Sequence, residues 1–313
     1  MSRRLLVGFK AGDLRAEMLS GEVTCHTLDI YHAHAIEKVF PRARVVCTPH
    51  LPAGPWDEIV FRTGPKVMSG ELSLDLLQEI HLLKPAAFRL DFVGKERDRN
   101  DLLDKVRKDP DRVRDFSAVW PASVPGGEKL LFTSYPGCFC HRRLDEGGLA
   151  LAEVVSKELS QPPTPTPTSS PCISLLDMGC GCGLVGLLIA KRISGVRLTL
   201  IDSHTRAVEA ARKNAAAFGV EATVILSDNG LPAPLAGEEM PRFDVFVGNP
   251  PYYSDYRIAE VFLTTAQRAL KPGGVCYTVV KNEAGLKPVQ ERFFPSVEVI
   301  RRRGYAVLKS VRR

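Results

Sequence analysis

Long apolar runs are missing from this 313-residue sequence. A helix that crosses a membrane needs roughly 18 or more consecutive apolar residues, and no window reaches that length. The amino terminus, MSRRLLVGFKAGDLRAE, meets further charges and a glycine before the apolar core of a signal peptide could form. The sequence therefore predicts a cytoplasmic protein with no membrane partner.

A disulfide framework and a metal cluster are missing as well. The eight cysteines are scattered, and a chain of this size needs no covalent staples, so we expect reduced thiols. Two C-x-C pairs occur, Cys138/Cys140 and Cys180/Cys182. Zinc sites usually place at least about two residues between such ligands, and the second pair lies among glycines. We expect no metal.

The composition is that of an ordinary globular protein, with 44% hydrophobic and 25% charged residues. At about 150 residues per domain, the length favours two domains. The net charge is only +6, but the stretch 301–313 contains no acid and six cations: Arg301, Arg302, Arg303, Lys309, Arg312 and Arg313. Such a basic edge suits a polyanion, although a solvent-exposed face explains any one of these residues slightly better.

Strand and helix patterns alternate through the second half of the sequence. We expect strands at 173–178, 197–202, 223–228, 243–253 (running into a proline turn) and 275–280. We expect helices at 184–193, 204–219 and 257–270, the last closed by KPGG at 271–274. Strands that alternate with helices form βαβ units and a mostly parallel sheet. The segment 297–311, turning near Arg303-Gly304, adds an antiparallel hairpin.

The first half repeats this pattern in weaker form. Three pairs of segments match in the same order: 56–66 with 243–253, 82–96 with 269–283, and 27–37 with 199–209. A duplicated unit is the simplest reason for such order. We therefore predict an α/β fold of two tandem Rossmann-like domains, at 1–120 and 121–313.

The first domain lacks the motifs of the second. Its opening strand is not followed by a dense glycine turn, and Arg62-Thr63-Gly64-Pro65 stands where the second domain has Asn249-Pro250-Pro251-Tyr252. We expect it to fold alike but to hold no cofactor. The segment 161–171, QPPTPTPTSSP, is typical of an extended tether. We interpret it as a disordered Pro/Thr-rich insertion inside the second domain.

A glycine-rich turn, DMGCGCGLVG at 177–186, joins a predicted strand to a predicted helix. Glycines permit a tight turn and let backbone N–H groups approach a ligand at the helix N-terminus. The G-x-G-x-x-G that starts at Gly181 also fits a dinucleotide site, so this motif alone leaves an NAD-dependent oxidoreductase open. Asp202 ends the next strand and suits a ribose hydroxyl, and Asp228 can accept from an adenine amino group.

Two motifs resemble those of class I S-adenosylmethionine-dependent methyltransferases. One is D-x-G-x-G-x-G, carried by Asp177, Gly179, Gly181 and Gly183. The resemblance implies that these residues lie at the methionine part of the cofactor. The other is Asn249-Pro250-Pro251-Tyr252, which resembles the (N/D/S)-P-P-(Y/F) motif of enzymes that methylate adenine N6, guanine N2 or a glutamine amide. It implies that Asn249 lies beside both cofactor and substrate.

The chemistry of amino methylation explains these residue types. An exocyclic amine is conjugated with its ring and is a poor nucleophile. The Asn249 side-chain oxygen and the Pro250 carbonyl can each accept one of its N–H groups, while the two prolines stiffen the turn. Tyr252 can stack on the flat substrate. A sulfonium is a good leaving group, so the transfer needs neither a metal nor a covalent intermediate.

A third block, Ser134–Val155, is similar to the segment that precedes motif I in ribosomal RNA guanine-N2 methyltransferases. The matching residues are Pro136, Gly137, Phe139, Leu144, Asp145 and Gly147. The resemblance implies that the block belongs to the catalytic domain and covers the cofactor, with Phe139 and Asp145 close to it. That family also has two tandem domains, of which the first binds no cofactor.

We therefore predict an S-adenosylmethionine-dependent enzyme that methylates the N2 amine of a guanine in ribosomal RNA. Its partner would be ribosomal RNA or an assembling ribosomal subunit, and we expect a monomer. Methylation of adenine N6 or of a release-factor glutamine stays open, although the glutamine enzymes typically carry a small helical domain in front. An NAD-dependent oxidoreductase would have no use for Asn-Pro-Pro-Tyr. A catalytically silent RNA-binding or assembly factor is the remaining alternative.

Overall fold

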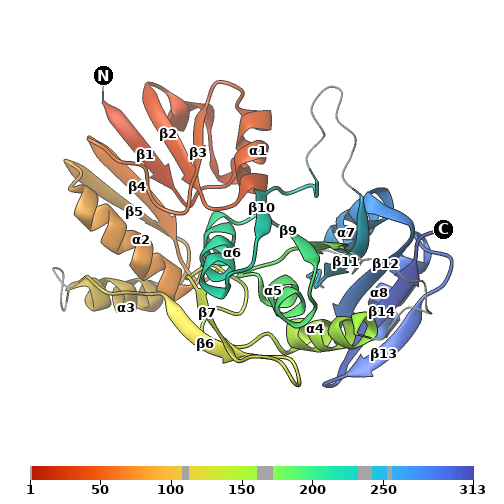
Figure 1. Cartoon of the computed structure of the whole chain (residues 1–313). Helices are drawn as coiled ribbons and strands as arrows, with labels where there is room; N and C mark the ends of the chain where they lie inside the picture. The colour runs from red at the N-terminus through yellow and green to blue at the C-terminus, as the bar shows by residue number, and fades with distance from the viewer. Residues whose placement is uncertain (1, 108–112, 161–171, 232–241, 252–255) are drawn as a thin grey trace. The chain divides into compact units, whose positions relative to one another are not determined.

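The computed structural model describes residues 2–107, 113–160, 172–231, 242–251 and 256–313. Their contacts divide the chain into two compact units (Figure 1). Unit 1 is Met1–Ala118 together with Tyr135–Cys138 and His204–Arg206, and unit 2 is Val119–Ser134, Phe139–Ser203 and Ala207–Arg313. The predicted insertion at 161–171 and Tyr252 lie outside the described residues. In the described ranges, no helix is long and apolar enough to cross a bilayer.

Unit 1 is built on a five-stranded parallel sheet in the order β3-β2-β1-β4-β5. The strands are β1 Arg3–Val7, β2 Glu22–Thr27, β3 Arg44–Cys47, β4 Glu58–Thr63 and β5 Ala87–Phe92. The helices are η1 Ala11–Asp13, η2 Ala16–Leu19, α1 Ile30–Val39, α2 Gly70–Leu83 and α3 Glu96–Arg107. Apolar strand residues such as Ile59 and Phe61 pack against Leu76 of α2 in the core.

Unit 2 contains a seven-stranded sheet in the order β10-β9-β8-β11-β12-β14-β13. Its strands are β8 Ile173–Met178, β9 Val196–Asp202, β10 Ala222–Leu226, β11 Phe243–Gly248, β12 Leu270–Val280, β13 Glu298–Arg302 and β14 Tyr305–Val311. A separate two-stranded sheet pairs β6 Ala118–Ala122 with β7 Leu130–Ser134. The helices are α4 Glu146–Leu159, α5 Leu184–Arg192, α6 Thr205–Phe218 (its first two residues, Thr205 and Arg206, belong to unit 1), α7 Arg257–Ala269 and α8 Glu283–Glu291. The first five strands are parallel and the last two antiparallel, as predicted.

The start of β12 and the turn between β13 and β14 show where the predicted pattern fails and where it holds. KPGG at 271–274 was expected to close a helix as a turn, but it lies within β12 as a bulge. Between two successive pairs of the ladder, β12 advances five residues, from Leu270 to Val275, while β11 advances only two, from Phe243 to Val245. The hairpin turn at Arg303-Gly304 is confirmed, and both residues have positive φ (+52° and +71°). This φ sign favours tight hairpins whose twist matches the strands.

The first five strands of each unit follow one order, because β3-β2-β1-β4-β5 corresponds to β10-β9-β8-β11-β12. The matched residues Asp57 and Asp244 also do the same work. The Asp57 carboxylate accepts the backbone N–H of Arg3 in β1 (2.7 Å), and the Asp244 carboxylate accepts that of Ser174 in β8 (2.8 Å). These shared details support the duplication, which remains a proposal.

Candidate active site

The glycine turn lies between β8 and α5, at the edge of the sheet where the parallel strands end. Gly179, Gly181 and Gly183 all have positive φ, at +68°, +56° and +88°. Gly183 occupies the N-cap position of α5, and a Cβ built on Gly181 would meet no atom within 4 Å. The turn therefore presents open space beside the backbone at a helix N-terminus, as a bound ligand requires.

Asp177 supports this turn from beneath. Its side chain is buried, and its carboxylate accepts the backbone N–H of Gly186 (2.9 Å). Burial raises the Asp177 pKa to about 7, although the Gly186 N–H bond lowers it. The carboxylate thus ties the end of β8 to the first turns of α5. Its predicted role at the cofactor would therefore be indirect, through the glycine turn that it supports.

Sequence reasoning missed a second support of the turn, Asn214 of α6. Its amide donates to the carbonyls of Cys182 (2.9 Å) and Thr133 (2.9 Å), and its oxygen accepts the N–H of Thr133 (2.8 Å). Asn214 is 1% exposed. A polar residue inside the alanine-rich stretch 210–217 was the available signal, since buried amides occur where they are fully hydrogen-bonded.

Two carboxylates lie at the ends of the neighbouring strands. Asp202 ends β9 and accepts the Gly181 N–H (2.8 Å), so it contacts the glycine turn directly. Asp228 follows β10 and is half-buried. Carboxylates are acceptors for the hydroxyl groups of a ribose and the amino group of an adenine. Together with the open space at Gly181, the two residues fit S-adenosylmethionine.

Asn249, which directly follows β11, is held by Asp145. The Asn249 Nδ2 donates to the Asp145 Oδ2 (2.8 Å). The other oxygen of Asp145 accepts the N–H of Gly147 (3.0 Å), so Asp145 is also the N-cap of α4. An ionised carboxylate can only accept, so it dictates which side of the amide faces it. The Asn249 oxygen is therefore turned away from Asp145.

Two glycines at the start of α4 make room for their neighbours, Gly148 for the Asp145 carboxylate and Gly147 for the Tyr305 ring. A Cβ on Gly148 would lie 2.6 Å from the Asp145 Oδ2, and one on Gly147 would lie 3.1 Å from the Tyr305 ring. Burial raises the pKa of Asp145, while N–H groups of Gly148, Asn249 and Gly147 lower it. Sequence reasoning placed Asp145 near the cofactor but missed its bond to Asn249, because 104 residues separate the two.

The other predicted site residues are partly placed. Pro250 is buried and Pro251 half-buried, directly after Asn249. Phe139 is 67% exposed, so its ring is accessible to a ligand. Tyr252 lies outside the described ranges. Among the described residues, no three His, Cys, Asp or Glu side chains gather as a metal site would need.

The methyltransferase small domain model matches residues 129–309, more than half of the chain. The chain belongs to this family. It is 34% identical over 170 residues to ribosomal RNA small subunit methyltransferase C of Pseudomonas aeruginosa, covering 52% of this chain and 45% of the relative. It is 37% identical over 175 residues to the protein of that name in Hahella chejuensis, covering 55% and 46%. The chain thus spans about half the length of these curated relatives.

A solved structure shows the fold over a greater length. A T. thermophilus 16S rRNA N2 methyltransferase, in complex with AdoMet and guanosine, matches with a TM-score of 0.80 and 19% sequence identity. The match covers 100% of this chain and 89% of that one. Both units therefore have counterparts in the fold of a known methyltransferase.

Proposed function

We propose that unit 2 transfers a methyl group from S-adenosylmethionine to the N2 amine of a guanine in ribosomal RNA. The observation that carries this proposal is the hydrogen bond between Asp145 and Asn249. It fixes an amide acceptor at the end of β11, on the sheet edge that also carries the glycine turn.

The fixed amide suits an amine that has two hydrogens to give. Because Asp145 occupies the NH₂ side of Asn249, the amide offers its oxygen to the substrate. The Pro250 carbonyl, next in the chain, would accept the second N–H. Both acceptors are set before the substrate arrives, which lowers the entropy cost of aligning the nitrogen for attack. A free amide could turn its own NH₂ toward the substrate amine, and two donors would then face each other.

The residues around the glycine turn would hold the cofactor. Asp202 would accept from the ribose hydroxyls and Asp228 from the adenine amine, while the turn at Gly179–Gly183 would lie against the methionine part. Once bound, S-adenosylmethionine supplies an electrophilic methyl group on a sulfonium. The chain's own contribution is to bind, to orient and to exclude water.

Guanine is the base favoured by the relatives. The matched curated proteins are named for the small-subunit ribosomal RNA, and the T. thermophilus structure holds guanosine. The target base would leave its stack to reach Asn249, at an expense of a few kcal/mol. Adenine N6 and a glutamine amide present the same pair of N–H groups, so the product must distinguish them.

We propose that unit 1 is the duplicate without a cofactor site. At the separation of 187 residues that matches the two halves, Arg62 stands where unit 2 has Asn249. The Arg62 guanidinium pairs with Asp13 (3.0 Å) and with Asp91. A cation held between two carboxylates offers no acceptor to an amine.

Nucleoside mass spectrometry provides the test. Purified protein, labelled S-adenosylmethionine and small-subunit RNA from cells lacking the enzyme should yield N2-methylguanosine. Asn249→Ala should lower the transfer rate by about 100-fold or more, because the acceptor acts on the reacting nitrogen. Its affinity for S-adenosylmethionine, measured by calorimetry, should stay within about twofold. N6-methyladenosine, or methylation of a glutamine peptide instead of RNA, would contradict the guanine assignment.

A further inference from the structure

The structure divides the cations of the basic stretch 301–313 into two groups. Four of them are paired with carboxylates: Arg302 with Glu153, Arg303 with Glu153 and Glu146, Arg301 with Glu283, and Lys309 with Glu158. These pairs fasten the hairpin to α4 and α8, so most of the predicted basic edge is neutralised. The other two cations, Arg312 and Arg313, follow the end of β14 and belong to a second group.

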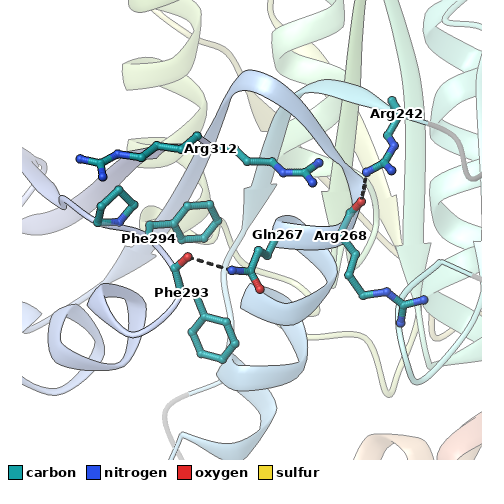
Figure 2. Close-up of a pocket in the computed structure, with 8 residues that line it drawn as sticks. Arg242, Gln267, Arg268, Phe293, Phe294 and Arg312 are labelled. Atoms are coloured by element: carbon teal, nitrogen blue, oxygen red, sulfur yellow. Dashed lines mark hydrogen bonds between the residues drawn. The ribbon is translucent and has the colours of Figure 1, made fainter.

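Arg312 and Arg313 line a surface hollow of about 570 Å³ together with Arg242 and Arg268 (Figure 2). We call it the arginine hollow. Among the described residues, its lining contains no Asp or Glu, and none of the four guanidinium groups has a described carboxylate within ion-pair distance. Four like charges around one space repel each other, so a neutralising anion would be favoured there.

Backbone carbonyls hold two of these head groups in place. Arg242 donates to the carbonyl of Arg268, and Arg312 donates to the carbonyl of Leu270. Both carbonyls lie at the C-terminal end of α7, where cations favour the helix dipole. This role accounts for one N–H of each side chain, whereas a guanidinium carries five. The remaining N–H groups of Arg242 and Arg312 are thereby held near the hollow, so a ligand that binds them loses little further side-chain entropy.

The arginine hollow lies at the end of the sheet opposite the candidate active site. Arg242 directly precedes β11, and Asn249 directly follows it. Six strand residues at about 3.3 Å each place the two roughly 20 Å apart. A mononucleotide cannot span that distance, but a polynucleotide of several residues can. The aromatic ring of Phe293, which also lines the hollow, adds a flat apolar surface that suits a sugar or base.

We propose that the arginine hollow binds the phosphate backbone of the RNA substrate, at a distance from the methylated base. The proposal rests on the proposed function and extends it. Arg242, Arg268 and Arg313 are exposed and would contact phosphates directly, and Arg312 is half-buried beside them. The enzyme would then favour a long, structured RNA over a short one that carries the same target guanine, because only the long RNA reaches both sites.

The test compares two triple variants that remove equal charge. Arg242→Gln/Arg268→Gln/Arg313→Gln empties the hollow of three cations. Arg89→Gln/Arg97→Gln/Arg292→Gln removes three exposed cations that already pair with Glu58, Asp101 and Glu260. Thermal melting checks that both variants stay folded. Binding to a structured RNA fragment of about 100 nucleotides is then measured across a range of salt concentrations.

We expect the hollow variant to lose about 10- to 100-fold in affinity for the long RNA at low salt. Its plot of log K against log salt should flatten by about 2, since each lost phosphate contact removes roughly 0.7–0.9 from the slope. Methylation of a short oligonucleotide should keep its kcat and KM within about twofold. The control variant should change the long-RNA affinity much less.

Three results would overturn the proposal: an unchanged salt slope, an equal loss in the control variant, or an equal loss on the short oligonucleotide. If inorganic triphosphate binds the wild type but not the hollow variant, and both bind RNA with the same affinity, the hollow is a site for a small anion instead. Should the wild type bind RNA with the expected slope but methylate no guanine, the hollow would stand and the proposed function would fail. The two proposals are thereby tested separately.

Discussion

Units 1 and 2 share a sheet order and differ at the sheet edge where the parallel strands end. In unit 1, a Cβ on Gly8, directly after β1, would lie 2.2 Å from the carbonyl oxygen of Arg62, so the chain's own backbone fills the space. In unit 2, a Cβ on Gly179, directly after β8, would lie 2.7 Å from the Phe262 ring, but the space beside Gly181, two residues further on, is open. Unit 1 then continues into the short helices η1 and η2, whereas unit 2 enters α5 directly. The apolar strands preserve the fold, and a few residues at their ends decide whether a ligand fits.

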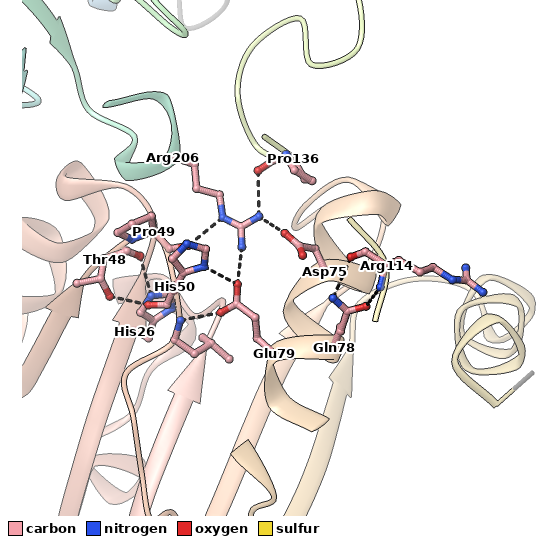
Figure 3. Close-up of polar contacts among 11 residues, drawn as sticks. His26, Thr48, Pro49, His50, Asp75, Gln78, Glu79, Arg114, Pro136 and Arg206 are labelled. Carbon is pink, nitrogen blue, oxygen red and sulfur yellow. Dashed lines mark hydrogen bonds and ion pairs between the residues drawn. The ribbon is translucent and has the colours of Figure 1, made fainter. Parts of the chain in front are cut away.

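Each unit also buries a charge, but with opposite sign and different partners. In unit 1, Arg206 is held by the carbonyl of Pro49 (2.9 Å) and by the carboxylates of Asp75 and Glu79 (Figure 3). The Arg206 side chain is 2% exposed. In unit 2, the Glu153 side chain is equally buried, but its arginine partners are 39–47% exposed. Loss of the buried partner should therefore harm the two units unequally.

The largest effect is expected from Arg206→Met. This change leaves Asp75 and Glu79 without their cation, and burial already raises the pKa of Asp75. Breaking such a buried pair from one side lowers the free energy of unfolding by about 3–5 kcal/mol. Glu153→Gln should lower it by only about 1–2 kcal/mol, because Arg302 and Arg303 can hydrate. Denaturant unfolding of the full chain measures the free energy of unfolding of both variants. Equal decreases would contradict the expected difference between the two buried charges.

The next effect concerns the matched pair Asn249 and Arg62. Asn249→Ala should reduce methyl transfer by about 100-fold or more, whereas Arg62→Ala should leave the transfer rate within about twofold. Arg62→Ala removes ion pairs to Asp13 and Asp91, so its effect should appear in stability instead. Single-turnover rates with saturating cofactor separate the two. A large rate loss in Arg62→Ala would mean that unit 1 takes part in the transfer.

A smaller loss is expected from Asp145→Ser. Serine still caps α4, but it is too short to hold the Asn249 amide. We expect kcat to fall by about 10- to 100-fold, since a displaced acceptor no longer aligns the amine. Affinity for S-adenosylmethionine should change little. The matched control is Asp29→Ser: Asp29 caps α1 in unit 1 through the N–H of Tyr31 (2.9 Å), in the unit that carries no Asn-Pro-Pro-Tyr turn.

A double-mutant cycle separates positioning from a direct role of Asp145. If Asp145 acts through Asn249, Asp145→Ser should lower the transfer rate no further once Asn249 has been changed to Ala. Additive losses would mean that Asp145 contacts the cofactor or the substrate itself. A second readout follows pH: as pH falls through the raised pKa of Asp145, the carboxyl becomes a donor and can no longer select the NH₂ side of Asn249. The transfer rate of the wild type should fall there.

The fold was largely predictable because its signals are local. The strand at 173–178 and the hairpin turn at Arg303-Gly304 follow from apolar runs and from glycine next to a turn residue. The KPGG segment was misjudged because Pro and Gly usually break strands, and a bulge is the exception that admits them. The helix α8 was missed because Pro288 lies inside it.

The candidate site was predictable in its residues but not in its contacts. Asn249 and the glycine turn were found because both motifs are contiguous in sequence. The bond from Asn249 to Asp145 and the pairing of Arg302 with Glu153 join residues more than 100 positions apart. No pattern along the chain encodes such pairs, since they arise when the sheet brings strand ends and helix starts together. For the same reason, the arginine hollow is visible only in three dimensions.

The last effect, a dependence of stability on pH that accumulates over several pH units, distinguishes two aspartates of unit 2. Burial raises the Asp177 pKa from 3.8 to about 7, so between these values the folded chain binds more protons than the unfolded chain. Stability should therefore fall as pH rises through this window, by up to about 1.4 kcal/mol per pH unit. Asp177→Asn retains an acceptor for the Gly186 N–H and should remove this slope.

Asp244 should show the opposite sign and serves as the control. Burial raises its pKa, but hydrogen bonds from Lys271 and Ser174 outweigh burial and lower it overall. Its contribution to stability is therefore present near neutral pH and lost as pH falls below its ordinary range. Unfolding free energies from about pH 2 to pH 8 for the wild type, Asp177→Asn and Asp244→Asn give both slopes. If Asp177→Asn keeps the wild-type slope, the Asp177 carboxylate is ionised throughout, and the glycine turn rests on a charge rather than on a neutral acid.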